Sequence, residues 1–209
     1  MKLYDYEGAP SPRRVRIFVA EKAMDIPTVQ VDLAAKSQHE PDFAKVNPHR
    51  TVPVLELDDG TRLTNTAGIC AYLEALHPEP ALLGRTPEEK GLIAQWEWRM
   101  ENDGYMAVGE AFRNKAKGFV NHALPGPVEY AQIPDLIDRG LRRTQQFFQF
   151  LDDVLAEREF IAGDRYSMAD ITTLVTIDFA KWMKQTLPES AVHARRWYDA
   201  VNARPSARA

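Results

Sequence analysis

The sequence predicts a small α/β unit followed by an all-helical unit. Short strand and helix signals alternate in the first part of the chain, a connector rich in proline follows at residues 77–84, and only helical patterns come after it. No internal repeat or low-complexity tract interrupts either part. We therefore expect one domain over residues 1–79 and a second over residues 85–209.

The elements of the first part follow from side-chain periodicity. Apolar and polar residues alternate in the strand candidates, and the Asp59-Gly60 pair between two of them is typical of a hairpin turn. In the helix candidates the apolar residues recur at helical spacing. The expected strands cover residues 2–6, 28–33, 52–57 and 61–63, and the expected helices cover residues 13–23 and 69–76.

Capping signals mark two helix starts in the second part. Thr86 precedes Pro87 and two acidic residues, which predicts a long helix with a threonine cap. Ser167 and Asp170 have the spacing of a capping box, with apolar residues on either side that can form a staple. A last helix is expected over residues 192–202.

Composition and charge exclude several classes of protein. The 26 basic and 30 acidic residues give a formal charge of −4, without the basic face of a general nucleic-acid or anionic-membrane binder. The longest apolar run, Ile69 to Leu73, has five residues, far fewer than the roughly 20 that cross a bilayer. The N-terminus carries acidic residues where an export signal has an apolar region.

Cys70 is the only cysteine, so an intramolecular disulfide, a four-cysteine zinc site and a C-x-x-C redox pair are all excluded. The position of Cys70 within an apolar helical pattern predicts a buried and inert thiol. We expect a cytoplasmic protein without a metal centre.

Pro53 lies inside a strand pattern, where a proline removes a ladder hydrogen bond and belongs at an edge or a bulge. With a cis Val52-Pro53 bond, the backbone of Val52 would face outward and pair with an extended peptide ligand. The alternative is an edge proline without a ligand, which the frequency of cis bonds, about 5% of X-Pro bonds, favours.

Two other polar segments open helices. Asn65 and Thr66 directly precede an apolar helical pattern, where free N–H groups and the Thr66 hydroxyl make a carboxylate site and Asn65 can accept from an ammonium group. The alternative is plain capping by Thr64 or Thr66. Ser11 before Pro12 predicts an N-cap, and its hydroxyl can also stabilise a thiolate brought by a ligand.

These three features, in this order, resemble the glutathione transferase superfamily. The matching segments are N-P-x-x-x-V-P-V-L from Asn47, T-N-T-A-G-I-C-A-Y-L-E from Thr64 and G-D-R-Y-S-M-A-D-I from Gly163. The resemblance covers the whole chain. It implies a thioredoxin-like N-terminal domain, a helical C-terminal domain, a homodimer, and a protein that binds glutathione as co-substrate and attacks electrophiles with its sulfur.

The resemblance also implies roles for single residues. Val52 and Pro53 would pair with the cysteinyl backbone of glutathione, while Asn65 and Thr66 stand where the family usually has Glu and Ser for the γ-glutamyl group. The stretch with Gln38, His39 and Arg50 would reach the glycine carboxylate.

The catalytic position departs from the family pattern, because Ala9 stands where family members with a catalytic serine place it. Ser11 is therefore our candidate for stabilising the thiolate, and Tyr6 is the fallback. Three nearby arginines, Arg13, Arg14 and Arg16, face either a partner or solvent.

The electrophile is expected to bind against the helical domain, at Tyr105, Met106, Phe112 and Arg113. The alternative for these side chains is core packing, which helical spacing also explains.

The sequence thus favours a glutathione transferase that conjugates the glutathione thiolate to small hydrophobic electrophiles. Two alternatives remain open: a glutathione-dependent disulfide or peroxide reductase, and a non-catalytic interaction module of the same fold. Asn65 replaces the usual Glu and Ala9 replaces the usual serine, and these two differences keep the non-catalytic interaction module open.

Overall fold

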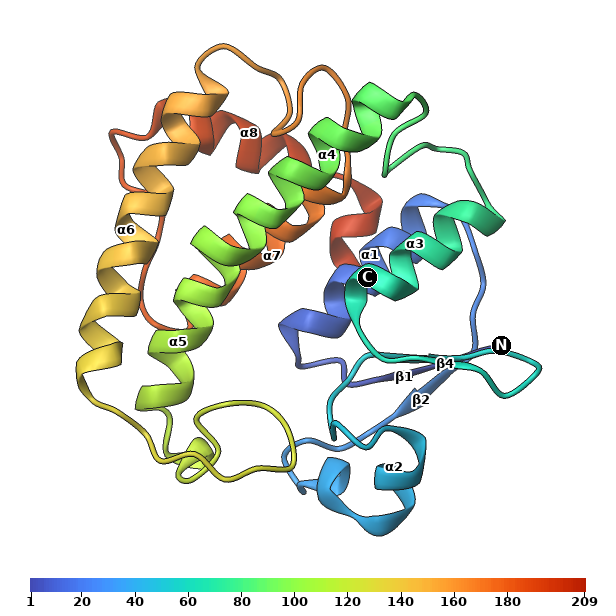
Figure 1. Ribbon diagram of the computed structural model, residues 1–209. Coiled ribbons are helices and arrows are strands. Elements are labelled where there is room, and N and C mark those ends of the chain that lie inside the picture. Colours follow the sequence, from blue (N-terminus) through green and yellow to red (C-terminus); the bar gives the residue numbers. More distant parts are fainter.

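A four-stranded mixed sheet forms the base of the N-terminal part of the computed structural model, which describes residues 1–209 (Figure 1). The strand order is β2-β1-β3-β4, with β1 parallel to β2 and antiparallel to β3. Leu3 of β1 pairs with Thr28 and with Leu55, which fixes the register of the two central strands. The strands are β1 (Lys2–Asp5), β2 (Thr28–Gln30), β3 (Val54–Glu56) and β4 (Arg62–Leu63).

Helices cover both faces of this sheet. Figure 1 shows α1 (Pro10–Glu21) and α3 (Thr66–Leu76) on one side and α2 (Pro41–Val46) on the other. The side with α2 has its own small apolar cluster around Phe43 and Val54. The chain between α2 and β3 and the starts of α1 and α3 carry the polar segments singled out in the sequence.

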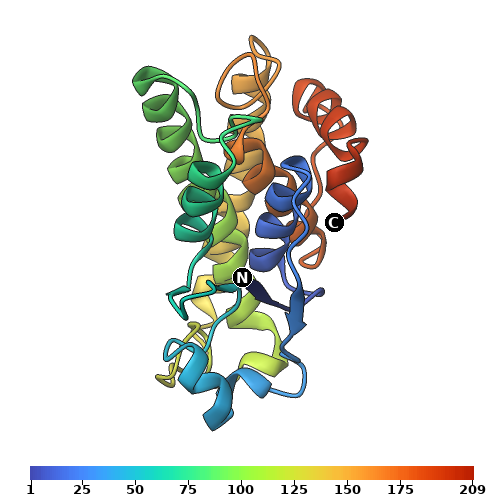
Figure 2. The same cartoon turned by 90° about the vertical axis from the view of Figure 1, so that its right-hand side faces the viewer.

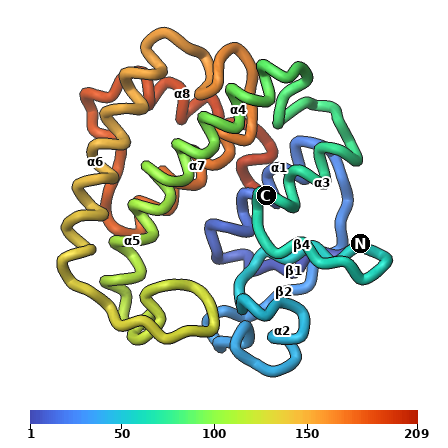
Figure 3. Tube along the Cα trace, in the orientation of Figure 1, coloured from blue at the N-terminus to red at the C-terminus, as the bar shows by residue number.

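The second part is a helical bundle. Its first three elements follow one another without a break: α4 (Pro87–Arg99), the π-helical segment η2 (Met100–Tyr105) and α5 (Met106–Lys115). The remaining helices are α6 (Asp135–Leu155), α7 (Met168–Lys181) and α8 (Val192–Asn202). Nearly every residue of α7 is buried, so this helix forms the centre of the bundle. The tube in Figure 3 shows the long loop between α5 and α6 extending toward the region of α2.

The two parts share one apolar core, which includes Val15 and Phe18 of α1 together with residues of α6, α7 and α8. Figure 2 shows α1 beside the C-terminal end of the chain. Arg13 of α1 forms an ion pair with Asp178 of α7 at 2.7 Å, and Arg204 binds Glu21 through two hydrogen bonds. The domains are therefore joined by both apolar and ionic contacts.

The expectation that the three arginines of α1 face a partner or solvent is wrong. Arg13 pairs with Asp178, Arg16 pairs with the buried Asp5 at 2.7 Å, and the side chain of Arg14 is only 3% exposed. All three bind within their own chain.

Most predicted helix starts are confirmed. Thr86 accepts from the Glu89 backbone N–H, Ser167 and Asp170 form the capping box, and the last helix covers Val192–Asn202. The prediction that Ser11 is an N-cap is wrong, because α1 already begins at Pro10. Both prolines fit the first turn, where no intrahelical N–H bond is lost.

None of the helices combines the length and the apolar character that crossing a membrane requires.

Candidate functional site

Two hydroxyl groups meet where α1 and α3 begin. Ser11 lies in the first turn of α1 and Thr66 is the first residue of α3, and their hydroxyl oxygens are 3.3 Å apart. Ala9 is the N-cap of α1, so the Ser11 hydroxyl does not cap the helix; within α1 it accepts from the side chain of Arg14. Both helix starts add a partial positive charge, and the N–H groups of Thr66 and Ala67 in α3 lack an intrahelical partner. In α1 only Ser11 offers such a group, because Pro10 and Pro12 have no N–H. The arrangement favours an anion.

In the segment before β3, the Val52-Pro53 bond is cis, against the expectation from frequency alone. Strand β3 begins only at Val54, and the backbone N–H and C=O of Val52 have no hydrogen-bond partner. Free peptide groups beside a strand can pair with an extended ligand.

Asn65 caps α3 by accepting from the Gly68 backbone N–H at 2.8 Å, so neither Thr64 nor Thr66 is the cap. The side chain of Asn65 is exposed, and an amide oxygen can accept a second hydrogen bond. The cap therefore fixes the oxygen of Asn65 at the helix start without exhausting it.

Arg14, which the sequence analysis did not assign to the site, is a buried cation beside Ser11. The Nη2 atom of Arg14 is 3.3 Å from the Ser11 hydroxyl oxygen, and the guanidinium carbon is 4.4 Å from the centre of the Tyr105 ring. The carboxylates of Glu97 and Glu101 face the same guanidinium at 3.9 and 3.3 Å. An arginine at helical spacing gives no signal of such burial, because its neighbours come from the other domain.

Burial governs the titration of the groups around Arg14. It raises the pKa of Glu97 to about 7, although Arg14 and a hydrogen bond from Thr172 oppose the increase. Burial also raises the pKa of Tyr105, again opposed by Arg14 and by the nearby Ser11. Tyr105 is therefore a neutral phenol at physiological pH.

A second polar group forms where the loop between α5 and α6 meets the N-terminal domain. The rings of His39 and His122 lie 5.0 Å apart, and Gly126 of the loop lies near the His49 carbonyl oxygen. Burial lowers the pKa of His39, and His122, Arg50 and Lys36 lower it further. This region thus concentrates basic groups.

Two buried polar atoms at this junction have no hydrogen-bond partner, namely the side-chain oxygen of Gln38 and Nδ1 of His122. Buried polar groups are nearly always paired, so both atoms are suited to a polar ligand. The sequence had singled out Gln38, His39 and Arg50 but not His122, which lies in a loop without a helical or strand pattern.

The expected electrophile residues occupy different surroundings. Phe112 lies in an aromatic cluster with Phe119, Phe179 and Trp182, at ring distances of 5.3 to 5.4 Å. Tyr105 contacts Phe179 in this cluster, so it joins the aromatic side chains to Arg14 and Ser11.

Arg113 and Met106 differ from this pattern. Arg113 donates to the backbone carbonyls of His122 and Ala123, which holds the loop against α5, and burial lowers its pKa to about 10. The side chain of Met106 is half exposed.

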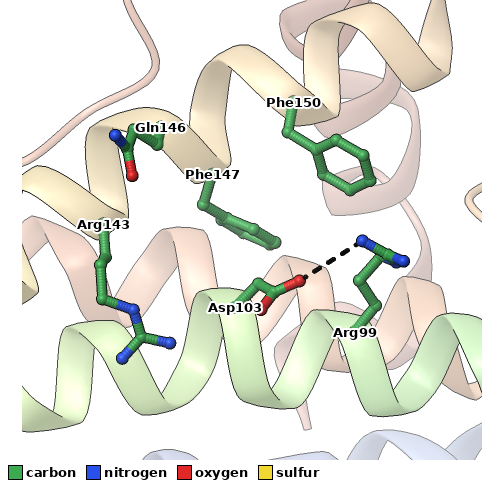
Figure 4. Close-up of a pocket in the computed structure, with 6 residues that line it drawn as sticks. All are labelled: Arg99, Asp103, Arg143, Gln146, Phe147 and Phe150. Carbon is green, nitrogen blue, oxygen red and sulfur yellow. Dashed lines mark ion pairs between the residues drawn. The ribbon is translucent and has the colours of Figure 1, made fainter.

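Two other features lie apart from this site. Cys70 is 1% exposed and burial raises the pKa of its thiol, which confirms the expectation of an inert cysteine. A cavity of about 210 Å³ lies between α4, η2 and α6, and Figure 4 shows Arg99 and Asp103 pointing into it. These two residues alternate along the chain with Glu97 and Glu101, which face Arg14, so the cavity opens on the other side of the helix.

Comparisons with known proteins agree with this arrangement. Residues 3–81 match the family description "Glutathione S-transferase, N-terminal domain", and residues 121–205 match "Glutathione S-transferase, C-terminal domain". Glutathione S-transferase 2 of Saccharomyces cerevisiae is 37% identical over 99% of this chain and 87% of its own length.

Two further relatives cover nearly the whole chain. A crystal structure of a glutathione S-transferase domain-containing protein from Marinobacter aquaeolei has a TM-score of 0.90 and 40% identity, and covers 99% of both chains. The disulfide-bond oxidoreductase YfcG of Escherichia coli is 24% identical over 98% of this chain and 92% of its own length. Family descriptions for both domains, together with close relatives of full length, show that the chain belongs to the glutathione S-transferase family.

Proposed function

We propose that this glutathione transferase joins the thiolate of glutathione to small hydrophobic electrophiles, and that Ser11 assists ionisation of the thiol. The observation that carries the proposal is the Ser11–Thr66 hydroxyl pair at the first turns of two helices. A thiol reacts as its thiolate, and hydrogen-bond donors at a helix N-terminus stabilise that form. The cytoplasm, whose glutathione keeps thiols reduced, is the compartment we propose.

The surrounding residues are suited to the rest of the tripeptide. The free peptide groups of Val52, next to Pro53, would pair with the cysteinyl backbone. The start of α3 at Thr66 would hold the γ-glutamyl carboxylate, and the oxygen of Asn65 would accept from its ammonium group.

The basic region of Gln38, His39 and Arg50 would bind the glycine carboxylate. Its support is the cluster of basic side chains there: beyond the effect of burial, His122, Arg50 and Lys36 lie close enough to His39 to lower its pKa further.

The electrophile would lie between the bound sulfur and the aromatic cluster. We assign Tyr105 and Phe112 to the wall of this pocket, Arg113 to the loop that closes it, and Met106 to its rim. The sulfur attacks the electrophilic carbon and forms a C–S bond, while the leaving group departs with the bonding electrons. Holding both reactants close together supplies much of the rate.

Replacing Ser11 by Ala tests the assignment. We expect the pKa of the bound glutathione thiol to rise by about one unit, and turnover of an aromatic chloride at neutral pH to fall roughly tenfold or more, because one donor to the thiolate is lost. Ultraviolet absorbance of the thiolate across pH measures the first and steady-state kinetics the second.

Ser190→Ala, at an exposed position of the helical domain, is the matched control and should change neither quantity. Unchanged thiol pKa and turnover in Ser11→Ala would exclude Ser11 and leave Tyr6 or backbone groups as the donors.

Glutathione-dependent reduction of disulfides is the second candidate function, favoured by the similarity to a disulfide-bond oxidoreductase. Since Cys70 is buried, such a reaction would use two glutathione molecules and no protein cysteine. Faster turnover of a small disulfide than of an aromatic chloride would favour this function. Retention of a protein partner without any thiol chemistry would instead favour the non-catalytic interaction module.

We also propose that the protein is a homodimer. No residue of α4 is buried in the single chain, and Leu92 and Trp98 of this helix are 50% and 63% exposed. Leu76 at the end of α3 is 45% exposed. A second copy covering this surface would remove these apolar groups from water.

A further inference from the structure

Arg14 is the buried cation closest to the hydroxyl pair. Burying a guanidinium costs free energy unless its charge and its N–H groups are satisfied. Here Nε and Nη1 have no hydrogen-bond partner, and the nearest oxygen of Glu97 is 3.9 Å away. Nη2 is the guanidinium nitrogen that has partners, Ser11 at 3.3 Å and Glu101 at 3.4 Å, so the ion pair with Glu101 leaves the other N–H groups of Arg14 unsatisfied.

The contact with Ser11 has only one possible direction. A guanidinium donates hydrogen bonds and accepts none, so Arg14 donates to a lone pair of the Ser11 oxygen at 3.3 Å. Ser11 and Thr66 have two hydroxyl protons, and their mutual contact uses one of them. Either hydroxyl can donate in that contact; with Arg14 on one lone pair of Ser11, donation from Thr66 fills the second and leaves the Ser11 proton for a ligand.

The two carboxylates that face Arg14 differ in solvent exposure and in titration. Glu101 lies at 3.3 Å, but its side chain is 37% exposed and its charge is screened by water. Glu97 is buried, and with a pKa of about 7 it is partly protonated at neutral pH. At neutral pH Arg14 therefore faces one solvent-exposed carboxylate and one that is partly protonated, while its own cation lies beside the Ser11 hydroxyl.

The second domain holds Arg14 in this position. Glu97, Glu101 and Tyr105 recur every four residues along α4 and η2, so their side chains share one helix face. The Tyr105 ring packs against the guanidinium, and both carboxylates lie within 4 Å of its Nη1 atom. Arg14 thus links the helical domain to the first turn of α1.

We propose that Arg14 is a positioning residue for the thiol chemistry: it orients the Ser11 hydroxyl so that its proton is donated to the sulfur of glutathione. This inference rests on the proposed function, because it needs glutathione to bind beside Ser11. No bond is made or broken by Arg14, which acts through Ser11 and through its charge.

The test compares Arg14→Gln with Arg14→Lys in the full-length protein, using glutathione as the probe. We expect Arg14→Gln to raise the pKa of the bound thiol by about one unit. Lysine keeps the charge but lacks the planar fork of arginine, so Arg14→Lys should recover only part of that shift. Binding is measured by calorimetry and the thiol pKa by ultraviolet absorbance in the same samples.

Arg13→Gln is the matched control, because it removes an ion pair between the domains from the same helix without touching Ser11. It should leave the thiol pKa unchanged. In a Ser11→Ala background, Arg14→Gln should have little further effect, since the two residues act as a unit.

Three results would overturn the inference. The first is an unchanged thiol pKa in Arg14→Gln with glutathione bound. The second is an equal shift in the Ser11→Ala background, which would mean that Arg14 does not act through Ser11. If Arg14→Gln fails to fold, Glu101→Gln is the replacement test. Removing the Glu101 carboxylate leaves the charge of Arg14 less compensated, so the pKa of the bound thiol should fall. An unchanged thiol pKa in Glu101→Gln is the third contrary result. If the wild-type protein binds no glutathione, the proposed function itself fails.

Discussion

Glu97 is a buried carboxyl group whose folded-state pKa lies well above its unfolded value. Burial raises that pKa from 4.5 to about 7. Between these two values the folded protein holds more protons than the unfolded chain, so the free energy of unfolding falls as pH rises through this window. Above pH 7 the ionised Glu97 lowers the free energy of unfolding by on the order of 1 to 3 kcal/mol. We expect Glu97→Gln to remove this dependence, because an amide does not titrate, while its oxygen still accepts from Thr172.

Urea unfolding between pH 4.5 and 8 measures the effect. Wild type and Glu97→Gln should differ most above pH 7, with the variant the more stable, and least near pH 4.5. Glu88→Gln in the exposed first turn of the same helix is the control. If the curves of wild type and Glu97→Gln run parallel over this range, Glu97 does not titrate as its burial indicates.

At the scale of the elements, α5 and α6 pack so closely that one glycine is required between them. A Cβ at Gly140 would lie 2.7 Å from the Ala107 carbonyl oxygen and 2.8 Å from the Ala111 backbone nitrogen. Backbone atoms cannot move aside as a side chain does. We expect Gly140→Ala to destabilise the protein by about 1 to 3 kcal/mol through overpacking.

Gly91 provides the matched control for Gly140. It also lies within a helix, but a Cβ there would meet nothing within 4 Å. Gly91→Ala should therefore stabilise the protein by up to about 1 kcal/mol through helix propensity alone. Denaturant midpoints of the two variants should move in opposite directions, and equal shifts would refute the packing argument.

The elements also show which features the sequence can predict. The helix starts at Thr86 and Ser167 were predicted correctly because a cap is a local interaction within four residues. The start of α1 was misplaced because Pro10 and Pro12 both fit a first turn, and the chain gives no local signal that selects between them.

The site shows the same distinction. Ser11, Val52 and Thr66 could be selected from their local patterns, since each opens or interrupts an element. Arg14 and His122 could not, because their surroundings come from tertiary contacts. Arg14 faces Tyr105, and His122 faces His39, across the boundary between the domains.

At the scale of the whole molecule, the two domains pack on each other but leave α4 uncovered on its outer side. Trp98 is the most exposed of the large apolar side chains, and Leu92 of the same helix is half exposed. The ion pairs of Arg13 and Arg204 are used within the chain, so they are not available for a partner. Assembly at this surface would therefore depend on apolar burial.

Trp98→Glu tests whether this surface joins two copies of the chain. A carboxylate buried in an apolar interface without a partner is costly, so we expect the variant to be monomeric at micromolar concentration where the wild type is dimeric. Val192→Glu, at a site 58% exposed on α8, adds the same charge elsewhere and should stay dimeric.

Sedimentation velocity distinguishes the monomer from the dimer. A monomeric wild type would contradict the homodimer, whereas a dimeric Trp98→Glu would mean that the interface lies on another face. Because Arg14 is held within its own chain, the thiol pKa of bound glutathione should be the same in the monomeric variant as in the wild type, which separates assembly from the chemistry at Ser11.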